Sequence, residues 1–94
     1  MRNYEIMTII NPALGEDKAK AVSKSVRDLL TDLKGEIIKT DFWGKKKLAY
    51  EIKGNKEGYY DVIDFKIDAA GLAKFKSKIR LMEDLVRYLV SAKS

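Results

Sequence analysis

The chain has 94 residues, of which 46% are hydrophobic and 35% are charged. This length and composition predict one soluble globular domain, residues 1–94, with a single hydrophobic core. No apolar run approaches the roughly 18–20 residues that a transmembrane helix needs. A strand-like pattern starts at the N-terminus, so we expect no signal peptide and no membrane-spanning segment.

Nineteen basic and fourteen acidic residues give a net charge of +5. This modest excess favours a polyanionic partner such as nucleic acid, or an anionic membrane surface. Cysteine and histidine are both absent from the sequence, which excludes disulfides, thiolate metal sites and the commonest general base. The composition fits a reducing cytoplasm. We expect no metal, no cofactor and no small-molecule substrate, and nothing in the sequence argues for an enzyme.

The first half of the chain predicts a strand followed by a helix. Residues 3–10 are largely apolar on both alternating faces, which is typical of a central strand, and Pro12 ends it. Residues 16–33 carry apolar side chains at three- and four-residue spacings, which predicts a helix. Gly35 is expected to be its left-handed stop.

Two further strands follow this helix. Residues 36–52 alternate as a strand that bends at Gly44, because a lone glycine in such a pattern indicates a bulge. Residues 53–58 form a turn, and residues 59–67 alternate again. The two strands are expected to pair as an antiparallel hairpin.

The last part of the chain predicts a helix over residues 69–81, with Asp68 as its N-cap, and a strand over residues 85–90. On this strand Val86, Tyr88 and Val90 alternate with Leu85, Arg87 and Leu89. The resulting order, β-α-β-β-α-β, predicts a ferredoxin-like α+β fold with a four-stranded antiparallel sheet.

One face of this sheet is a predicted interface. Right-handed crossovers place both helices on the same side of the sheet and leave the other side uncovered. Exposed apolar surface of that size indicates a binding site for a protein partner. We expect this face to include Met7, Ile9, Tyr60, Val62 and Leu89.

The bend at Gly44 presents Trp43 and the three consecutive lysines 45–47. Adjacent ammonium groups repel one another unless an anion neutralises them, which indicates a phosphate contact. The alternative is an edge strand that lysines protect from aggregation, and charge alone slightly favours it. Phe42 and Tyr50 share the alternation of the apolar residues around the bend, so we expect both in the core.

No catalytic or base-stacking arrangement emerges from the strands. Asp61 and Asp64 fall on opposite faces of their strand, which disfavours a paired-carboxylate site. An RNA recognition motif carries K/R-G-F/Y-G/A-F-V-x-F/Y on its third strand, and residues 57–64 match only at Gly58, Tyr59 and Val62. The two aspartates stand where stacking aromatic residues are required.

Two segments resemble the protein 6 family of the bacterial small ribosomal subunit. The N-terminal residues MRNYE are similar to the family's M-R-x-Y-E start, and residues 43–50, WGKKKLAY, to its W/L-G-[RK]-[RK]-x-L-A-Y signature. The resemblance covers nearly the whole chain. Glu51 stands where the family usually has proline. The long, often acidic C-terminal tail of some members has no counterpart here, so its role is not carried over.

The resemblance implies a structural, non-catalytic component of the 30S subunit in the cytoplasm. It implies binding to the central domain of 16S ribosomal RNA together with protein 18 of the same subunit. Basic residues would contact phosphate, and the apolar sheet face would contact the protein. The candidate RNA-binding residues are Arg2, Lys45, Lys46, Arg80, Arg87 and Lys93. For Arg2 and Arg87 a solvated charge is an equal alternative.

A second class of function fits the same pattern. A regulatory or scaffolding module could form a homodimer through its open sheet face. Salt distinguishes the two interpretations, because nucleic-acid binding weakens steeply with ionic strength whereas an apolar dimer interface is hardly affected.

Overall fold

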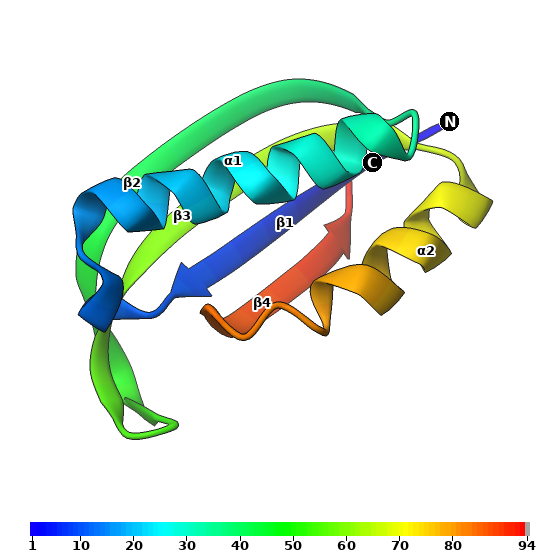
Figure 1. The fold of residues 1–94 in the computed structure, drawn as a ribbon. Helices are drawn as coiled ribbons and strands as arrows, with labels where there is room; N and C mark the ends of the chain where they lie inside the picture. The colour runs from blue at the N-terminus through cyan, green and yellow to red at the C-terminus, as the bar shows by residue number, and fades with distance from the viewer. Residues whose placement is uncertain (94) are drawn as a thin grey trace.

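The computed structural model describes residues 1–93 and shows a four-stranded antiparallel sheet with two α-helices on one side (Figure 1). The strand order is β2-β3-β1-β4, so the first strand is central and the second and third form a hairpin. The predicted β-α-β-β-α-β order is confirmed. The elements are β1 (Arg2–Ile10), the short 3-10 helix η1 (Pro12–Leu14), α1 (Glu16–Asp32), β2 (Glu36–Ile52), β3 (Asn55–Ile67), α2 (Ala69–Ile79) and β4 (Leu85–Ala92).

The hydrophobic core lies between the sheet and the two helices. On β3 the side chains of Ile63, Phe65 and Ile67 are buried, while the residues between them are only partly buried. This alternation matches the one predicted for residues 59–67. Full burial of such a side chain contributes about 1.5–3 kcal/mol. The core cluster consists of Ile6, Ile10, Ala19, Val22, Val26, Leu30, Tyr59, Ile63, Phe65, Ile67, Phe75, Ile79 and Leu85.

The end of α1 differs from the prediction. The residue with positive φ is Lys34, at 65°, and not Gly35. Gly35 is needed for a different reason, because a Cβ atom there would lie 2.9 Å from the carbonyl oxygen of Leu30 and 3.2 Å from that of Lys66. Close packing against two backbone carbonyl groups therefore selects glycine at this position.

The start of α2 matches the prediction. The Asp68 carboxylate accepts a hydrogen bond of 2.6 Å from the backbone N–H of Gly71, which makes it the N-cap. The helix ends at Ile79, two residues earlier than expected. No helix within residues 1–93 is long and apolar enough to cross a membrane.

The hairpin between β2 and β3 turns more tightly than predicted. Only two residues separate the strands, Lys53 and Gly54, with φ values of 50° and 80°. Positive φ at both positions is the geometry that suits a two-residue hairpin. Gly58, which was expected in the turn, is a buried residue of β3.

Interruptions of strand pairing change which side chains share a face. The β2–β3 register shifts three times, and one shift falls between Phe42 and Gly44, whose φ is 82°. The predicted bend at Gly44 is thus confirmed.

A second interruption lies between β1 and β4, where the register shifts between Ile9 and Ile10. Leu85 consequently pairs with Ile10 and belongs to the core. Its predicted place on the face of Arg87 and Leu89 is wrong, because the shift reverses the alternation at the start of β4.

Candidate binding surfaces

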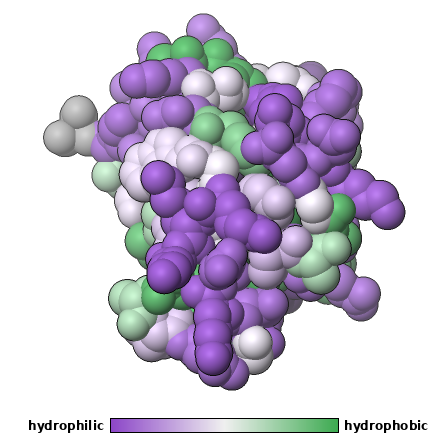
Figure 2. Space-filling view, turned by 90° about the vertical axis from the view of Figure 1, so that its left-hand side faces the viewer, coloured by the Kyte–Doolittle hydropathy of each residue, from purple (hydrophilic) through white to green (hydrophobic). Residues whose placement is uncertain are grey.

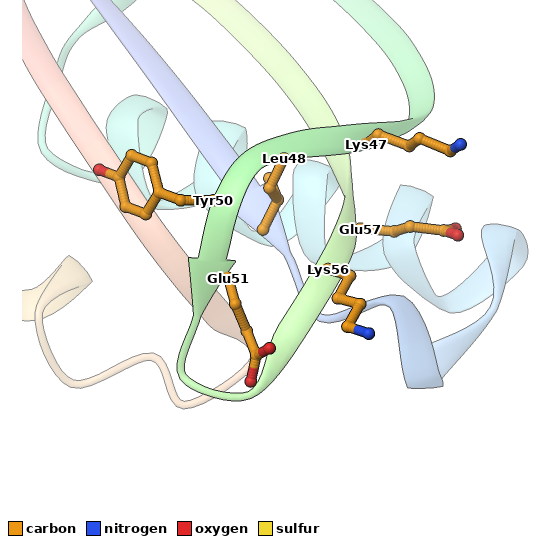
Figure 3. Close-up of a pocket in the computed structure, with 6 residues that line it drawn as sticks. All are labelled: Lys47, Leu48, Tyr50, Glu51, Lys56 and Glu57. Carbon is orange, nitrogen blue, oxygen red and sulfur yellow. The ribbon is translucent and has the colours of Figure 1, made fainter.

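The end of the β2–β3 hairpin covers part of the sheet face that the helices leave open. Figure 3 shows Tyr50 extending from the hairpin toward β4, and its hydroxyl oxygen accepts a hydrogen bond of 2.5 Å from Arg87 Nη1. The hairpin and the sheet enclose a hollow of about 250 Å³, here called the sheet groove. It is lined by Met7, Ile9, Leu48, Ala49, Tyr50, Ile52, Tyr60, Arg87 and Leu89.

The groove changes which of the predicted partner-face residues are accessible. Ile9 lies on the predicted side of the sheet and lines the groove, but it is only 4% exposed. Met7, Tyr60 and Val62 are half-buried, and Leu89 is 55% exposed. Four of the five predicted residues therefore remain accessible to a partner.

Phe42 and Tyr50 lie on opposite sides of the sheet. Phe42 packs against the core, as predicted, and stacks on Tyr59 with 6.1 Å between ring centroids. Tyr50 is 61% exposed on the open side, so its predicted place in the core is wrong. The bulge before Gly44 inserts one residue into β2 and thereby reverses the facing of the side chains that follow it, so that Tyr50 lies on the open side.

The other half of the open face is polar. The Lys93 ammonium group lies 2.9 Å from Asp64 Oδ2 and 3.6 Å from Glu5 Oε2. The hydrogen bond to Asp64 raises the pKa of Lys93 above its usual value. Val62 and Asp41 line a hollow beside these residues. Lys93, a predicted RNA contact, is therefore already held by two carboxylates.

An aromatic pair separates the two halves of the open face. The rings of Trp43 and Tyr60 stack with 6.2 Å between centroids and an interplanar angle of 3°. The indole N–H of Trp43 donates a hydrogen bond of 2.8 Å to Asp41 Oδ2. This stacked pair was missed from the sequence, where the only signal was an aromatic residue directly before Gly44. It does not lie at the positions that an RNA recognition motif uses.

The three consecutive lysines do not form one cluster. Lys45 pairs with Tyr59 across the hairpin. Its ammonium nitrogen lies 5.8 Å from the centroid of the Tyr59 ring and 3.8 Å from Glu57 Oε2. Lys46 pairs with Gly58 and therefore belongs to the opposite, open side of the sheet. In Figure 3 Lys47 extends to the side of Glu57, away from Tyr50.

The remaining predicted RNA contacts are also spread over the molecule. Arg2 lines a hollow with Asp68 and Ala69 at the start of α2, and Arg80 caps the other end of that helix. Arg87 lies in the sheet groove. Figure 2 shows the end of the molecule where α1 begins and β2 bends, and hydrophilic side chains cover most of that surface. The structure thus offers several separate basic positions.

A buried carboxyl group lies under α1, on the side of β3 opposite Asp64. Asp61 is 1% exposed, and its Oδ2 atom accepts a hydrogen bond of 2.5 Å from Ser23 Oγ. Arg27 Nη1 donates to the same hydroxyl group at 2.7 Å. Asp61 Oδ1 has no partner among the described residues. Burial raises the pKa of Asp61 above 3.8, and the Ser23 hydrogen bond and the Arg27 charge only partly oppose this.

Replacing Asp61 with Asn is expected to stabilise the protein at neutral pH. In the folded state the raised pKa means that the charged form is disfavoured, so stability decreases as the pH rises from about 3.8 through that pKa. The side-chain amide of the introduced Asn carries no charge, so this loss of stability does not occur. Its oxygen can still accept the hydrogen bond from the Ser23 hydroxyl group. We expect a gain above the roughly 0.5 kcal/mol scatter of surface substitutions, measured by denaturant unfolding across pH.

The pH-dependent part of the difference between the Asp61→Asn variant and the parent should shrink as the pH falls and vanish well below 3.8, where the parent's carboxyl group is protonated in both the folded and the unfolded state. Ser23→Ala is the companion variant, and it should cost less in the Asn background than in the parent. A variant that is less stable than the parent at neutral pH would show that Ser23 and Arg27 outweigh the burial of the charge.

Within residues 1–93, no group of three or more acidic side chains is placed to hold a metal ion. The hollows within these residues are lined by a mixture of apolar and charged side chains. The element order and the four-stranded antiparallel sheet with two helices define a ferredoxin-like α+β domain.

The family is established by comparison with known proteins. The model of the family "Ribosomal protein S6" matches residues 3–92, and the chain belongs to this family. The small ribosomal subunit protein bS6 of Fusobacterium nucleatum is 44% identical over 90 residues, covering 96% of each chain. The bS6 protein of Moorella thermoacetica is 36% identical over 91 residues, covering 97% of this chain and 93% of that protein.

A solved structure supports the same conclusion. The crystal structure of 30S ribosomal protein S6 from Thermotoga maritima aligns with a TM-score of 0.92 at 32% identity, covering 98% of this chain and 87% of that one. The family predicted from the N-terminal residues and the WGKKKLAY segment is therefore confirmed, as is the ferredoxin-like fold. As a ribosomal protein of this family, the chain is structural and not an enzyme.

Proposed function

We propose that the chain binds the central domain of 16S ribosomal RNA together with protein 18 of the small subunit. The observation that carries this proposal is the family match over residues 3–92, with relatives that are small-subunit proteins over nearly their whole length. A small-subunit ribosomal protein resides in the 30S subunit, in the cytoplasm. The role is structural, since the protein holds RNA and a second protein together.

The open sheet face supports a protein partner. It combines the half-buried Met7, Tyr60 and Val62 with the exposed Leu89, next to the stacked ring of Trp43. Apolar and aromatic side chains at the centre of a patch with charged residues around them are typical of protein interfaces. Ile9 lines the groove on this face but is buried, so it is not accessible to a partner.

The basic residues support RNA contacts at separate points. Arg2, Lys46 and Arg80 are exposed, which suits contacts with backbone phosphates. Lys45 and Lys93 already face carboxylates, so a phosphate would compete with Glu57, Asp64 or Glu5 for them. Arg87 already donates a hydrogen bond to a tyrosine hydroxyl oxygen. We therefore assign Arg2, Lys46 and Arg80 as the principal phosphate contacts.

RNA affinity is expected to depend on the protein partner. The modest net charge and the dispersed basic positions give weak binding alone, and a second protein on the sheet face adds contacts to the same RNA. Adding protein 18 should tighten binding to central-domain RNA by more than tenfold, a coupling above about 1.4 kcal/mol. Filter binding or fluorescence anisotropy at several salt concentrations measures both affinities.

Two single variants serve as internal comparisons in that experiment. Lys46→Ala should flatten the salt dependence by about one phosphate contact. Lys24→Ala should leave it unchanged, because Lys24 is paired with Asp28 at 2.8 Å on α1. Equal RNA affinity with and without protein 18 would contradict the proposal, and self-association that salt hardly affects would support a homodimer instead.

A further inference from the structure

We infer that Arg87 and Tyr50 together bind one acidic side chain of the protein partner at the sheet groove. The inference rests on the proposed function, since the partner is the small-subunit protein named there. Arg87 lies on β4 and Tyr50 on β2, and the hydrogen bond from Arg87 Nη1 to the Tyr50 hydroxyl oxygen joins these two strands on the open face. Among the described residues that line the groove, Arg87 is the single charged one.

The β2–β3 hairpin brings Tyr50 to Arg87 because its ladder is interrupted. The register shifts between Lys47 and Ile52, and residues 48–51 have no partner on β3. This segment lies over the sheet, and Tyr50 extends from it toward β4 (Figure 3). The Arg87 guanidinium group is therefore held in position before a partner binds, which reduces the entropy that binding costs.

The charge of Arg87 is not balanced by a carboxylate. Lys93, on the other half of the open face, is held by two carboxylates, whereas Arg87 donates to a neutral hydroxyl group and forms no ion pair within residues 1–93. A guanidinium group has five N–H donors, and the bond to Tyr50 uses one of them. The Tyr50 hydroxyl group accepts through its oxygen, so its own hydrogen can also donate. The pair thus offers several donors to one acceptor group.

A protein segment that covers the groove has to supply an anion. The groove is lined mainly by apolar side chains, such as those of Met7, Leu48 and Leu89, so a segment seated there removes Arg87 from water. A charge that loses its hydration without a matched partner is strongly unfavourable. The two oxygens of a carboxylate match the planar guanidinium group. Charge complementarity therefore specifies an aspartate or glutamate flanked by apolar residues.

A phosphate of RNA fits this position less well. The sugar–phosphate backbone is polar, so it gains little from the apolar lining of the groove. The hollow on the other half of the face is lined by Glu5, Asp41 and Asp64, against two lysines. Its net negative charge disfavours an RNA backbone that crosses the face. A protein segment can supply apolar side chains and a carboxylate together.

Affinity for protein 18 in the absence of RNA tests the inference. Arg87→Met keeps a long apolar side chain and removes the charge, so the complex should weaken at least about tenfold and depend less on salt. Arg80→Met is the matched control and should bind like the parent, because Arg80 lies at the end of α2, outside the groove. Circular dichroism checks the folding of both variants. Equal or tighter binding by a folded Arg87→Met variant would mean that the groove takes apolar surface only, which overturns the inference.

Double-mutant cycles identify the acceptor on the partner. Replacing each acidic side chain of protein 18 in turn with its amide should reveal one whose loss weakens the parent complex but not the Arg87→Met complex. Tyr50→Phe removes the hydroxyl group alone. It should weaken the parent complex severalfold and have little effect in the Arg87→Met background. A scan that finds no such acidic residue overturns the inference, as do additive effects of Tyr50→Phe and Arg87→Met.

Other occupants of the groove give different results. Unchanged affinity of Arg87→Met for protein 18, with weaker binding to central-domain RNA, would make Arg87 a phosphate contact; the inference is then overturned and the proposed function stands. Self-association of the parent chain that Arg87→Met abolishes, with binding to protein 18 unaffected, would identify a second copy as the occupant and has the same consequence. Failure of the parent chain to bind protein 18 overturns the proposed function and this inference with it.

Discussion

A lysine in place of Val62 is expected to weaken the complex with protein 18 by at least about 2 kcal/mol, roughly thirtyfold. Val62 lies on the open sheet face, and a charged group at the centre of an interface loses its hydration without gaining a matched partner. In the free chain the fold should persist, because Asp41 and Asp64 line the same hollow and can accept the new ammonium group. Isothermal titration calorimetry measures the affinity.

Leu81→Lys is the control for this substitution. Leu81 is another exposed apolar residue, 76% exposed, but it follows α2 and is not part of the sheet face. It should bind protein 18 like the parent chain. Thermal unfolding should show a cooperative transition for both variants. Normal binding by a folded Val62→Lys variant would place the partner elsewhere on the molecule.

Gly58→Ala is expected to destabilise the protein by about 1–3 kcal/mol, the cost of inserting a methyl group into a packed site. Gly58 is a buried residue of β3, and an added Cβ atom would overlap Cγ2 of Ile9 on the neighbouring strand. The branched side chain of Ile9 cannot move aside without leaving its own buried position. For a domain of this size the melting temperature should fall by roughly 5–20 °C, as followed by circular dichroism.

The same substitution in an Ile9→Ala background isolates the cause. Removing the γ-carbons of Ile9 opens the space that the added methyl group needs, so Gly58→Ala should cost little there. The double-mutant cycle should then show strong coupling between the two sites. Additive effects would mean that the cost of Gly58→Ala comes from the strand backbone and not from Ile9.

Local patterns were sufficient for the order and identity of the elements. The three- and four-residue spacing of residues 19–33 placed α1 within one residue of its end, and Asp68 was found as an N-cap from its type and position alone. The alternation of Ile63, Phe65 and Ile67 correctly marked the core face of β3. These features depend on neighbouring residues in the chain, which is why a single sequence reveals them.

Other features of the sheet faces depended on how the strands pair. The places of Tyr50 and Leu85 were wrong because a register shift reverses the alternation, and its position is set by two strands together. The stack of Trp43 on Tyr60 follows from the same bulge. An alternating pattern is read along one strand alone. It therefore gives no sign of a bulge, and it assigns the residues beyond the bulge to the wrong face.

The sequence by itself therefore determined the fold class, the family and the presence of an apolar sheet face. Only the tertiary structure decided what that face exposes. The hairpin end folds back over the sheet, Ile9 packs where Gly58 has no side chain, and carboxylates hold two of the predicted RNA-binding lysines, Lys45 and Lys93. Each of these contacts joins residues on different strands. The exposure of the side chains therefore depends on how the strands pack together, which no local sequence pattern encodes.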